Sequence, residues 1–445
     1  MTSPSTEQVS PQTLRKVIIA AGIGNFVEWF DFAVYGFLAT TIAQQFFPSG
    51  DASAALLKTF AVFAVAFAFR PLGGIFFGML GDRIGRKRTL AMTILLMAAA
   101  TTLIGLLPTY AAIGVAAPIL LSLIRCAQGF SAGGEYAGAC AYLMEHAPSD
   151  KRAWYGSFVP VSTFSAFAAA AVVAYALEAS LSAEAMGSWG WRLPFLIAAP
   201  LGLVGLYLRW KLDETPAFEA VKQEHAVAHS PLKDTLRNHG AAICCLGAFV
   251  SLTALSFYMF TTYFATYLQV AGGLSRALAL LVSLLALIFA AVICPLAGLY
   301  SDRVGRRVTV MTACVLLIVV VYPSFLMASS GSFAASIVGV MLLAVGAVLC
   351  GVVTAALLSE TFPTRTRYTA SAITYNMAYT LFGGTAPLVA TWLISATGSN
   401  LSPAFYLIAV ALLALAGGLA LPETSRISLH DVGTEEQSAA ALVSR

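Results

Sequence analysis

Five ionisable residues lie inside long apolar stretches of this sequence: Glu28, Asp31, Arg70, Arg125 and Glu135. An ionised side chain in hydrocarbon costs about 2.5–3.5 kcal/mol even on lenient scales, so such residues face a protein interior or a cavity and usually have a function. The three acids outnumber the two arginines, which leaves one acid without a basic partner. A carboxyl group in that position can bind and release a proton, so the pattern indicates proton coupling. The alternative role of these charges is to lock helices together.

The first apolar stretch places two carboxylates on one helical face. Gly24, Glu28, Asp31 and Tyr35 follow one another at spacings of four, three and four residues, and residues so spaced share a face. Two carboxylates one turn apart repel each other, so we expect one of them to exchange its proton in the working pH range. Arg70, in the second stretch, is the expected partner of one of the two acids.

The fourth apolar stretch carries a second polar face, with Arg125 and Gln128. Glu135 lies about 15 Å farther along that helix by its rise per residue, so we do not expect it to pair with Arg125. The second half of the chain offers hydroxyl, amide and aromatic side chains in its apolar stretches, and no acid in mid-helix. We therefore predict that the first half handles the proton and that the second half mainly contacts a solute.

The candidate solute ligands combine amides with aromatic rings. Ring faces and tyrosine hydroxyls suit a small zwitterion or a quaternary ammonium group, although plain packing is the alternative for the aromatic residues. The candidates are Asn25, Tyr35, Gln128, Tyr258, Tyr263, Tyr375, Asn376 and Phe382.

The elements that must position these residues follow from the composition. Of the 445 residues, 59% are hydrophobic and 10% are charged, whereas a soluble domain has about a quarter charged residues. About 20 apolar residues cross a bilayer, and this chain has twelve such stretches, which predicts an all-α polytopic membrane protein with twelve transmembrane helices. Their expected limits are 17–42, 55–81, 89–108, 113–144, 154–177, 193–210, 240–269, 277–300, 308–328, 333–359, 368–395 and 401–421.

The placement of basic residues predicts the orientation. If the N-terminus is cytoplasmic, the cytoplasmic segments hold 20 of the 25 lysines and arginines, and the opposite side holds only Lys58, Arg192 and Arg276. This is a strong positive-inside bias, so we expect both termini in the cytoplasm. The expected location is the plasma membrane, the inner membrane of a bacterium. The first apolar stretch is too long for the core of a signal peptide, so we expect no cleavable signal.

The chain repeats itself at three corresponding loops. Residues 78–87 match 298–307, Glu145 and Arg152 match Glu360 and Arg367, and 212–215 match 421–424. We therefore expect two pseudo-symmetric six-helix bundles that run parallel, with solute bound between them and alternating access by rocking. The predicted divisions are a lead at 1–16, a first bundle at 17–210, a linker at 211–239, a second bundle at 240–421 and a tail at 422–445.

These loops resemble those of the major facilitator superfamily. Residues 78–88 are similar to its signature between the second and third helices, and 298–307 to the second copy. The finer resemblance is to the metabolite:proton symporter family, at 24–32, 70–74, 128–136, 189–195 and 214–218. Within that family, 35–37, 133–138 and 213–216 look most like the proline/glycine-betaine transporter branch.

The resemblance implies a function and a gate. The implied function is proton-coupled symport that imports a small polar solute: a zwitterionic osmolyte such as proline or betaine, or a small organic acid. It also implies that Arg125 and Gln128 take part in proton coupling, and that a salt-bridge latch closes the cytoplasmic side. The latch residues are Asp82, Arg86, Glu145, Arg152, Asp302, Arg306, Glu360 and Arg367.

Several rival functions are disfavoured. A primary pump needs a phosphate-binding loop, which is absent from the sequence. We do not expect an enzyme or a metal site, because the five histidines lie in polar segments and the seven cysteines in or beside apolar ones. A dicarboxylate or citrate symporter of the same family, a drug/proton antiporter and a non-transporting sensor remain alternatives. The expected partners are a solute, protons and lipid, with no cofactor, no nucleic acid and a functional monomer.

Overall fold

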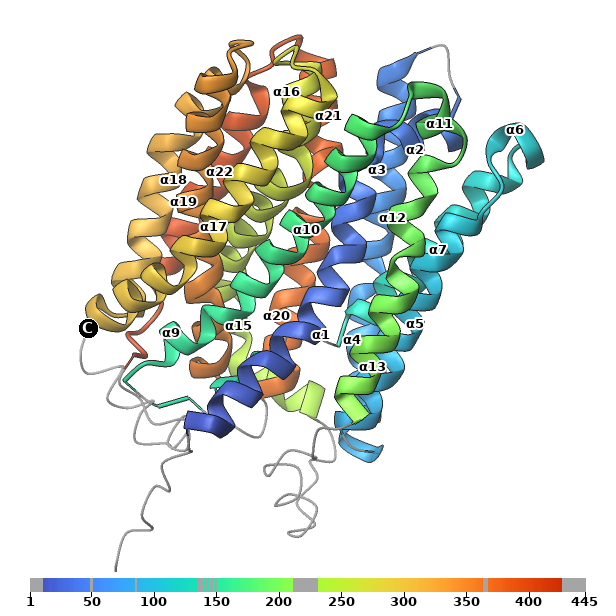
Figure 1. Ribbon diagram of the computed structural model, residues 1–445. Coiled ribbons are helices and arrows are strands. Elements are labelled where there is room, and N and C mark those ends of the chain that lie inside the picture. The colour runs from blue at the N-terminus through green and yellow to red at the C-terminus, as the bar shows by residue number, and fades with distance from the viewer. Residues whose placement is uncertain are drawn as a thin grey trace, which may run out of the picture.

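The structure is a computed structural model, and the part of the chain that it describes contains helices joined by turns and loops, with no strand. The described residues are 11–48, 51–84, 86–134, 136, 140, 143–144, 147–148, 150–210, 231–362 and 367–425. The helices run roughly side by side as long rods, which form two groups (Figure 1). The first group, called the first half below, comprises α1 to α13, and the second half comprises α15 to α22.

The first half consists of long helices with several short helical segments between them. Its elements are α1 (Pro11–Phe37), α2 (Ala39–Phe46), α3 (Ala52–Ala68), α4 (Arg70–Ile84), α5 (Arg86–Leu106), α6 (Tyr110–Ile113), α7 (Ala116–Ala132), α9 (Arg152–Gly156), α10 (Phe158–Ser180), α11 (Ala183–Ser188), η1 (Gly190–Arg192), α12 (Leu193–Leu196) and α13 (Ala198–Trp210).

The second half has two helices that are widened by a π-helical turn. Its elements are α15 (Pro231–Tyr258), the π turn η2 (Met259–Tyr263), α16 (Phe264–Val270), α17 (Arg276–Val304), α18 (Arg306–Ala328), α19 (Phe333–Glu360), α20 (Arg367–Ala378), the π turn η3 (Tyr379–Gly383), α21 (Ala386–Thr397) and α22 (Ser402–Leu419). Such turns often mark functional sites in helices.

The described helices account for the twelve expected spans. Nine of them are long and apolar enough to cross a membrane, and the bent pair Gly22–Phe37 and Ala39–Phe46 makes a tenth. Two shorter apolar helices, Ala91–Leu106 and Ala116–Ala132, lie where the third and fourth spans were predicted. The non-helical backbone of His239 inside α15 falls next to the predicted start of the seventh span at residue 240. The domain limits stay a prediction.

Glycines let α7 pack tightly against α3 and α4, which carry the second span. A side chain at Gly129 would collide with the backbone carbonyl of Ala66, and one at Gly133 with that of Arg70. Small residues at such contacts let membrane helices approach closely. This packing brings Arg70 and Arg125 into the same interior.

Candidate functional site

Glu28 and Arg70 form an ion pair in the centre of the first half. The Arg70 Nη2 atom lies 3.7 Å from the Glu28 Oε1 atom, and both side chains are 1% exposed or less. Of the two acids considered as partners for Arg70, Glu28 is therefore the one that pairs with it. Removing one member of a buried pair leaves an uncompensated charge, which is strongly destabilising.

Aromatic rings surround the Arg70 guanidinium. Its Cζ atom lies 5.3 Å from the ring centre of Phe67, 5.7 Å from Phe32, 5.8 Å from Trp29 and 5.9 Å from Tyr379. Each distance is within the range of a cation–π interaction. None of its three side-chain nitrogens has a hydrogen-bond partner among the described residues. Arg70 is thus a buried cation with N–H groups available for a ligand.

A chain of hydrogen bonds connects Asp31 to Arg125. The Arg125 Nη1 atom donates to Gln128 Oε1 over 2.8 Å, and Gln128 Nε2 donates to Thr101 Oγ1 over 2.6 Å. Thr101 Oγ1 in turn donates to Asp31 Oδ2 over 2.8 Å. All four residues are buried, so a change of protonation at Asp31 alters the field at Arg125 through three short contacts. Sequence reasoning missed Thr101, which carries no charge to mark it.

Arg125 also lies within an aromatic cluster. Its Cζ atom is 4.2 Å from the ring centre of Tyr35, 5.1 Å from Phe63 and 5.2 Å from Phe32. The Tyr35 hydroxyl donates to the carbonyl of Thr59 over 3.0 Å. Tyr35, predicted as a solute ligand, therefore presents its ring face to Arg125 and its hydroxyl to α3.

Asn25 connects α1 to α10. Its Nδ2 atom donates to Ser162 Oγ over 2.8 Å and to Thr163 Oγ1 over 2.7 Å. Its Oδ1 atom accepts from Trp29 Nε1 over 2.9 Å. These bonds occupy both ends of the amide and hold Trp29 beside Arg70, so in this arrangement Asn25 positions a ring of the site.

The second half supplies tyrosines to the same centre. Tyr258 has its ring centre 5.1 Å from Phe67 and 6.1 Å from Tyr379, and its buried hydroxyl has no hydrogen-bond partner among the described residues. Tyr375 stacks on Tyr379 at 3.9 Å and on Tyr136 of the first half at 4.3 Å. The stack of Tyr136, Tyr375 and Tyr379 thus crosses between the halves next to Arg70.

The other second-half candidates lie at different places. Asn376 Nδ2 donates to the carbonyl of Gly133 over 2.9 Å, which joins the halves, and its buried Oδ1 has no hydrogen-bond partner among the described residues. Tyr263 has its described ring contacts with Phe60 and Tyr267, at 6.4 Å and 6.1 Å. Phe382, in η3, is half-buried at the edge of the apolar core. The periodicity of the sequence did not reveal Trp29, Phe67 or Tyr379, which surround Arg70.

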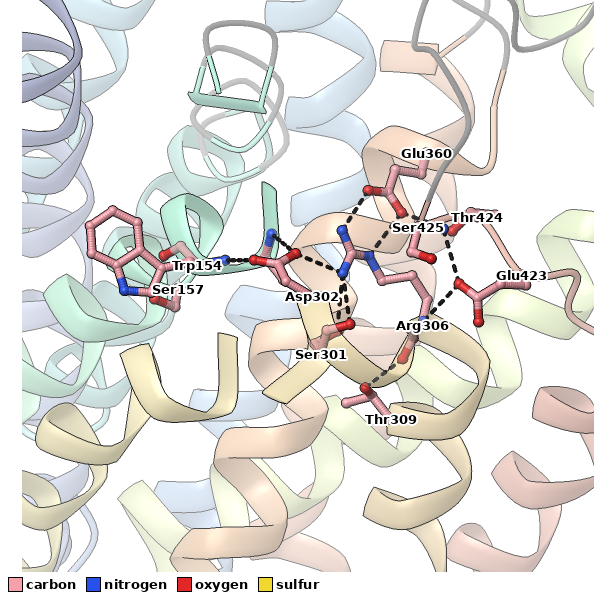
Figure 2. Close-up of polar contacts among 12 residues, drawn as sticks. Trp154, Ser157, Ser301, Asp302, Arg306, Thr309, Glu360, Glu423, Thr424 and Ser425 are labelled. Atoms are coloured by element: carbon pink, nitrogen blue, oxygen red, sulfur yellow. Dashed lines mark hydrogen bonds and ion pairs between the residues drawn. The ribbon is translucent and has the colours of Figure 1, made fainter. Parts of the chain in front are cut away.

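A dense polar network lies at one end of the helices (Figure 2). Arg306 forms a two-bond contact with Glu360, at 3.1 Å and 3.0 Å, and donates to Asp302 Oδ1 over 2.9 Å. Asp302 also accepts from the backbone N–H groups of Ala153 and Trp154 in the first half, at 3.0 Å and 2.9 Å. Three predicted latch residues thus form one network that joins the two halves.

The remaining predicted polar residues are described only in part. Arg152 is buried near this network at the start of α9. The described side chains do not include those of four predicted latch residues, Asp82, Arg86, Glu145 and Arg367. They also do not include that of Glu135, from the proton-coupling set.

The segment after α22 completes the network. Glu423 Oε1 accepts from the backbone N–H of Arg306 over 2.8 Å and its Oε2 from that of Arg307 over 3.0 Å, while Thr424 Oγ1 donates to Glu360 over 2.8 Å. Burial raises the pKa of the Glu423 carboxyl, but these N–H groups and those of Ser425 outweigh burial, so its pKa lies below the ordinary value. An anion at the start of α18 also interacts favourably with the helix dipole. The predicted latch did not include Glu423 or Thr424.

A comparison with known protein families identifies the family to which this chain belongs. The family model described as Major Facilitator Superfamily matches this chain at residues 21–387 and 295–443. The chain belongs to the major facilitator superfamily. The predicted fold class is thereby confirmed, and the chain is a multi-pass membrane transporter of this superfamily.

Named relatives cover most of the chain. A proline/betaine transporter of Salmonella typhimurium is 39% identical over 422 residues, which are 93% of this chain and 84% of the relative. A glycine betaine/proline/ectoine/pipecolic acid transporter, OusA, of Dickeya dadantii has the same identity and coverage. An ectoine/proline transporter, ProP, of Corynebacterium glutamicum is 36% identical over 96% of this chain and 87% of the relative. All three are named as transporters, so the prediction that the chain is not an enzyme is confirmed.

Solved structures agree with this fold at low sequence identity. The proton:xylose symporter XylE bound to 6-bromo-6-deoxy-D-glucose matches with a TM-score of 0.75 and 17% identity over 95% of this chain and 99% of that one. A partially occluded inward-open form of the Escherichia coli xylose transporter XylE matches with a TM-score of 0.70 and 18% identity over 93% of this chain and 99% of that one. At these identities the likeness establishes the fold alone.

Proposed function

We propose that the chain imports a small zwitterionic solute, such as proline or a betaine, together with protons. The observation that carries this proposal is the Arg70 guanidinium, which is buried among four rings and has N–H groups without hydrogen-bond partners among the described residues. A solute carboxylate would accept charge-assisted hydrogen bonds from these N–H groups. The ammonium group of the same solute would lie against the faces of Trp29 and Tyr258.

The charges of the described site favour a zwitterion over a dicarboxylate. Arg70 and Arg125 balance Glu28 and Asp31 when all four are ionised. A neutral zwitterion leaves this balance intact, whereas a dicarboxylate would bring two further negative charges into a buried environment, at a large desolvation cost. The relatives named above transport proline, betaine or ectoine according to their names, which supports the same choice.

Asp31 is the proposed proton carrier. Glu28 already lies beside a guanidinium, whereas Asp31 is connected to Arg125 through the hydrogen bonds of Thr101 and Gln128. Protonation of Asp31 removes the negative charge at the end of this series of hydrogen bonds. Arg125 is then free to reorient between its rings. The proton is the coupling ion in this proposal, and no other cofactor is needed.

The proposal also assigns sides and a functional unit. The network around Arg306 lies on the cytoplasmic side, both termini are cytoplasmic, and the membrane is the bacterial inner membrane. The solute site lies between the halves of a single chain, so a monomer suffices for transport.

The test is uptake by proteoliposomes that contain the purified protein. An imposed inward proton gradient should drive accumulation of radiolabelled proline or glycine betaine, and excess citrate or 2-oxoglutarate should not compete. Arg70→Lys removes the planar fork that binds a carboxylate with two bonds, so solute affinity should fall by about 10–100-fold, as for the loss of a hydrogen bond to a charge. Arg192→Lys is the matched control, because Arg192 donates to the carbonyls of Gly105 and Leu107 within the first half, away from the proposed solute site. Accumulation of citrate rather than proline would refute the proposed substrate class.

A further inference from the structure

Helix α17 contacts the first half through a charged residue at each of its ends. Arg276 is its first residue, and Asp302 lies in its last turn. By helix rise the two are about 39 Å apart. Asp302 accepts hydrogen bonds from the start of α9, as described above. At the opposite end, Arg276 Nη2 donates to Thr41 Oγ1 of α2, and its Nη1 atom lies 3.4 Å from Glu178 Oε2 of α10.

The charges of the Arg276 contact are unfavourable within their own helices. A helix has partial positive charge at its N-terminus and partial negative charge at its C-terminus. Arg276 is a cation at the N-terminus of α17, and Glu178 is an anion in the last turn of α10. Each charge is therefore disfavoured by its own helix, and among the described residues its compensating charge lies across the boundary between the halves. An ion pair that only stabilised one half would not need charges that each oppose the dipole of their own helix.

The two contacts lie at opposite ends of one pair of packed helices. Helix α10 continues α9 and lies beside α17 (Figure 1). A rocking motion that separates the halves at one end keeps them together at the other, because each half moves as a packed body. Opening at the Arg306 end therefore breaks the Asp302 contact, and opening at the other end breaks the Arg276 contact.

We propose that Arg276, Glu178 and Thr41 form a second latch, which closes the end of the transporter opposite to Asp302. The competition between the Arg276 latch and the Asp302 contact sets which side of the solute site opens at rest. This inference rests on the proposed alternating-access function. The side chains of Arg276 and Glu178 are 21% and 25% exposed, so the pair can break and reform in each cycle at a modest cost.

The test measures distances between the halves at both ends, without solute. Spin labels are placed at Ser180 and Leu278 near the Arg276 latch, and in a second protein at Lys151 and Val304 near Asp302, after replacement of the seven natural cysteines. In liposomes, Arg276→Gln should increase the population with a long Ser180–Leu278 distance by about two- to fivefold, the range for an ion pair that solvent partly reaches. Asp302→Asn should instead increase the population with a long Lys151–Val304 distance.

Two further variants make the result decisive. The exchange Arg276→Glu with Glu178→Arg keeps the pair and suits both helix dipoles, so it should restore the short Ser180–Leu278 distance. The control Arg192→Gln breaks bonds within the first half at the same end and should leave both distance distributions unchanged. The latch proposal would be overturned if Arg276→Gln kept the wild-type distances. It would also be overturned if Arg276→Gln and Asp302→Asn lengthened the same label pair. A failure of the substrate proposal would appear in the uptake assay alone, because these distances are measured without solute.

Discussion

The guanidinium groups of Arg70 and Arg125 share one aromatic ring. Their Cζ atoms lie 5.7 Å and 5.2 Å from the ring centre of Phe32. Phe32 follows Asp31 directly in α1. The arginine proposed to bind solute and the arginine connected to the proposed proton carrier are thus in contact with the same side chain, which provides a short physical path between solute and proton.

Phe32→Leu should weaken coupling between proton and solute. Leucine keeps an apolar side chain of similar size but removes the ring face, and each cation–π contact is worth about 0.5–2 kcal/mol. We expect gradient-driven accumulation to fall several-fold while solute exchange without a gradient persists, as measured in proteoliposomes. The control is Phe30→Leu, because Phe30 is also buried in α1 but stacks on Phe26. Equal accumulation in both variants would argue against the shared ring as a coupling element.

Thr101→Val should interrupt the chain between Asp31 and Arg125. Valine removes the hydroxyl that donates to Asp31 and accepts from Gln128, and a buried polar group left without its partner costs about 1–3 kcal/mol. We expect proton-driven uptake to fall by about tenfold or more and its dependence on pH to change. The neighbouring Thr102→Val is the control, because the described hydrogen bond of Thr102 is to the carbonyl of Ala98 in its own helix. If the two variants behave alike, Thr101 is not part of the proton pathway.

Gly129→Ala should destabilise the protein through the packing of α7 on α3. The added methyl group would collide with the backbone carbonyl of Ala66, and overpacking of this kind costs about 1–3 kcal/mol or more. We expect a lower melting temperature in detergent and reduced uptake. Gly351→Ala, inside α19, meets no atom within 4 Å and should leave the melting temperature unchanged or raise it slightly. A wild-type melting temperature in Gly129→Ala would contradict this contact.

Glu423→Gln should make stability less dependent on acid pH. The pKa of Glu423 is below its ordinary value of 4.5, so its ionised form is favoured in the folded protein. Its contribution is fully present above pH 4.5 and is lost as the pH falls through the lower pKa of the folded state. At neutral pH the variant should lose about 0.3–1 kcal/mol, the value of an anion at a helix N-terminus. Melting temperatures between pH 7 and pH 3 test this, because the difference between the two proteins should shrink toward the acid end.

Much of the architecture could be predicted from the sequence because a bilayer imposes simple rules on length and charge. The apolar stretches predicted most of the spans within a few residues, as at His239, where a break in α15 marks the expected start of the seventh span. The family resemblance implied a latch that includes Asp302, Arg306 and Glu360, and in the structure Arg306 donates hydrogen bonds to both carboxylates. These residues are ionisable and recur at fixed offsets, so they stand out against an apolar background.

The contacts around Arg70 were harder to predict. Helical periodicity tells which residues share a face, but not how far each helix is rotated against its neighbours. Trp29 and Phe67 look like ordinary core residues in the sequence, yet both lie against the guanidinium. Tyr263 is the same residue type as Tyr258 and lies in the same apolar stretch, but it packs against Phe60 and Tyr267. Uncharged residues such as Thr101 acquire a role only through neighbours that are distant in sequence.

The two π turns have a consequence for how chain length can vary. In η3 the N–H of Gly384 bonds to the carbonyl of Tyr379, five residues back, and in η2 the N–H of Phe264 bonds to that of Met259. A regular α-helix closes this ring over four residues and turns by about 100° per residue. The five residues of a π turn therefore advance the helix by about the same angle as four residues of an α-helix. Deleting one residue from η2 or η3 would convert the turn to a regular α-helix and leave α16 or α21 facing nearly the same way. If the turn became α-helical with all its residues kept, α16 or α21 would instead rotate by about 100° and its lipid-facing surface would turn inward, while Tyr258 and Tyr379 kept their places beside Arg70.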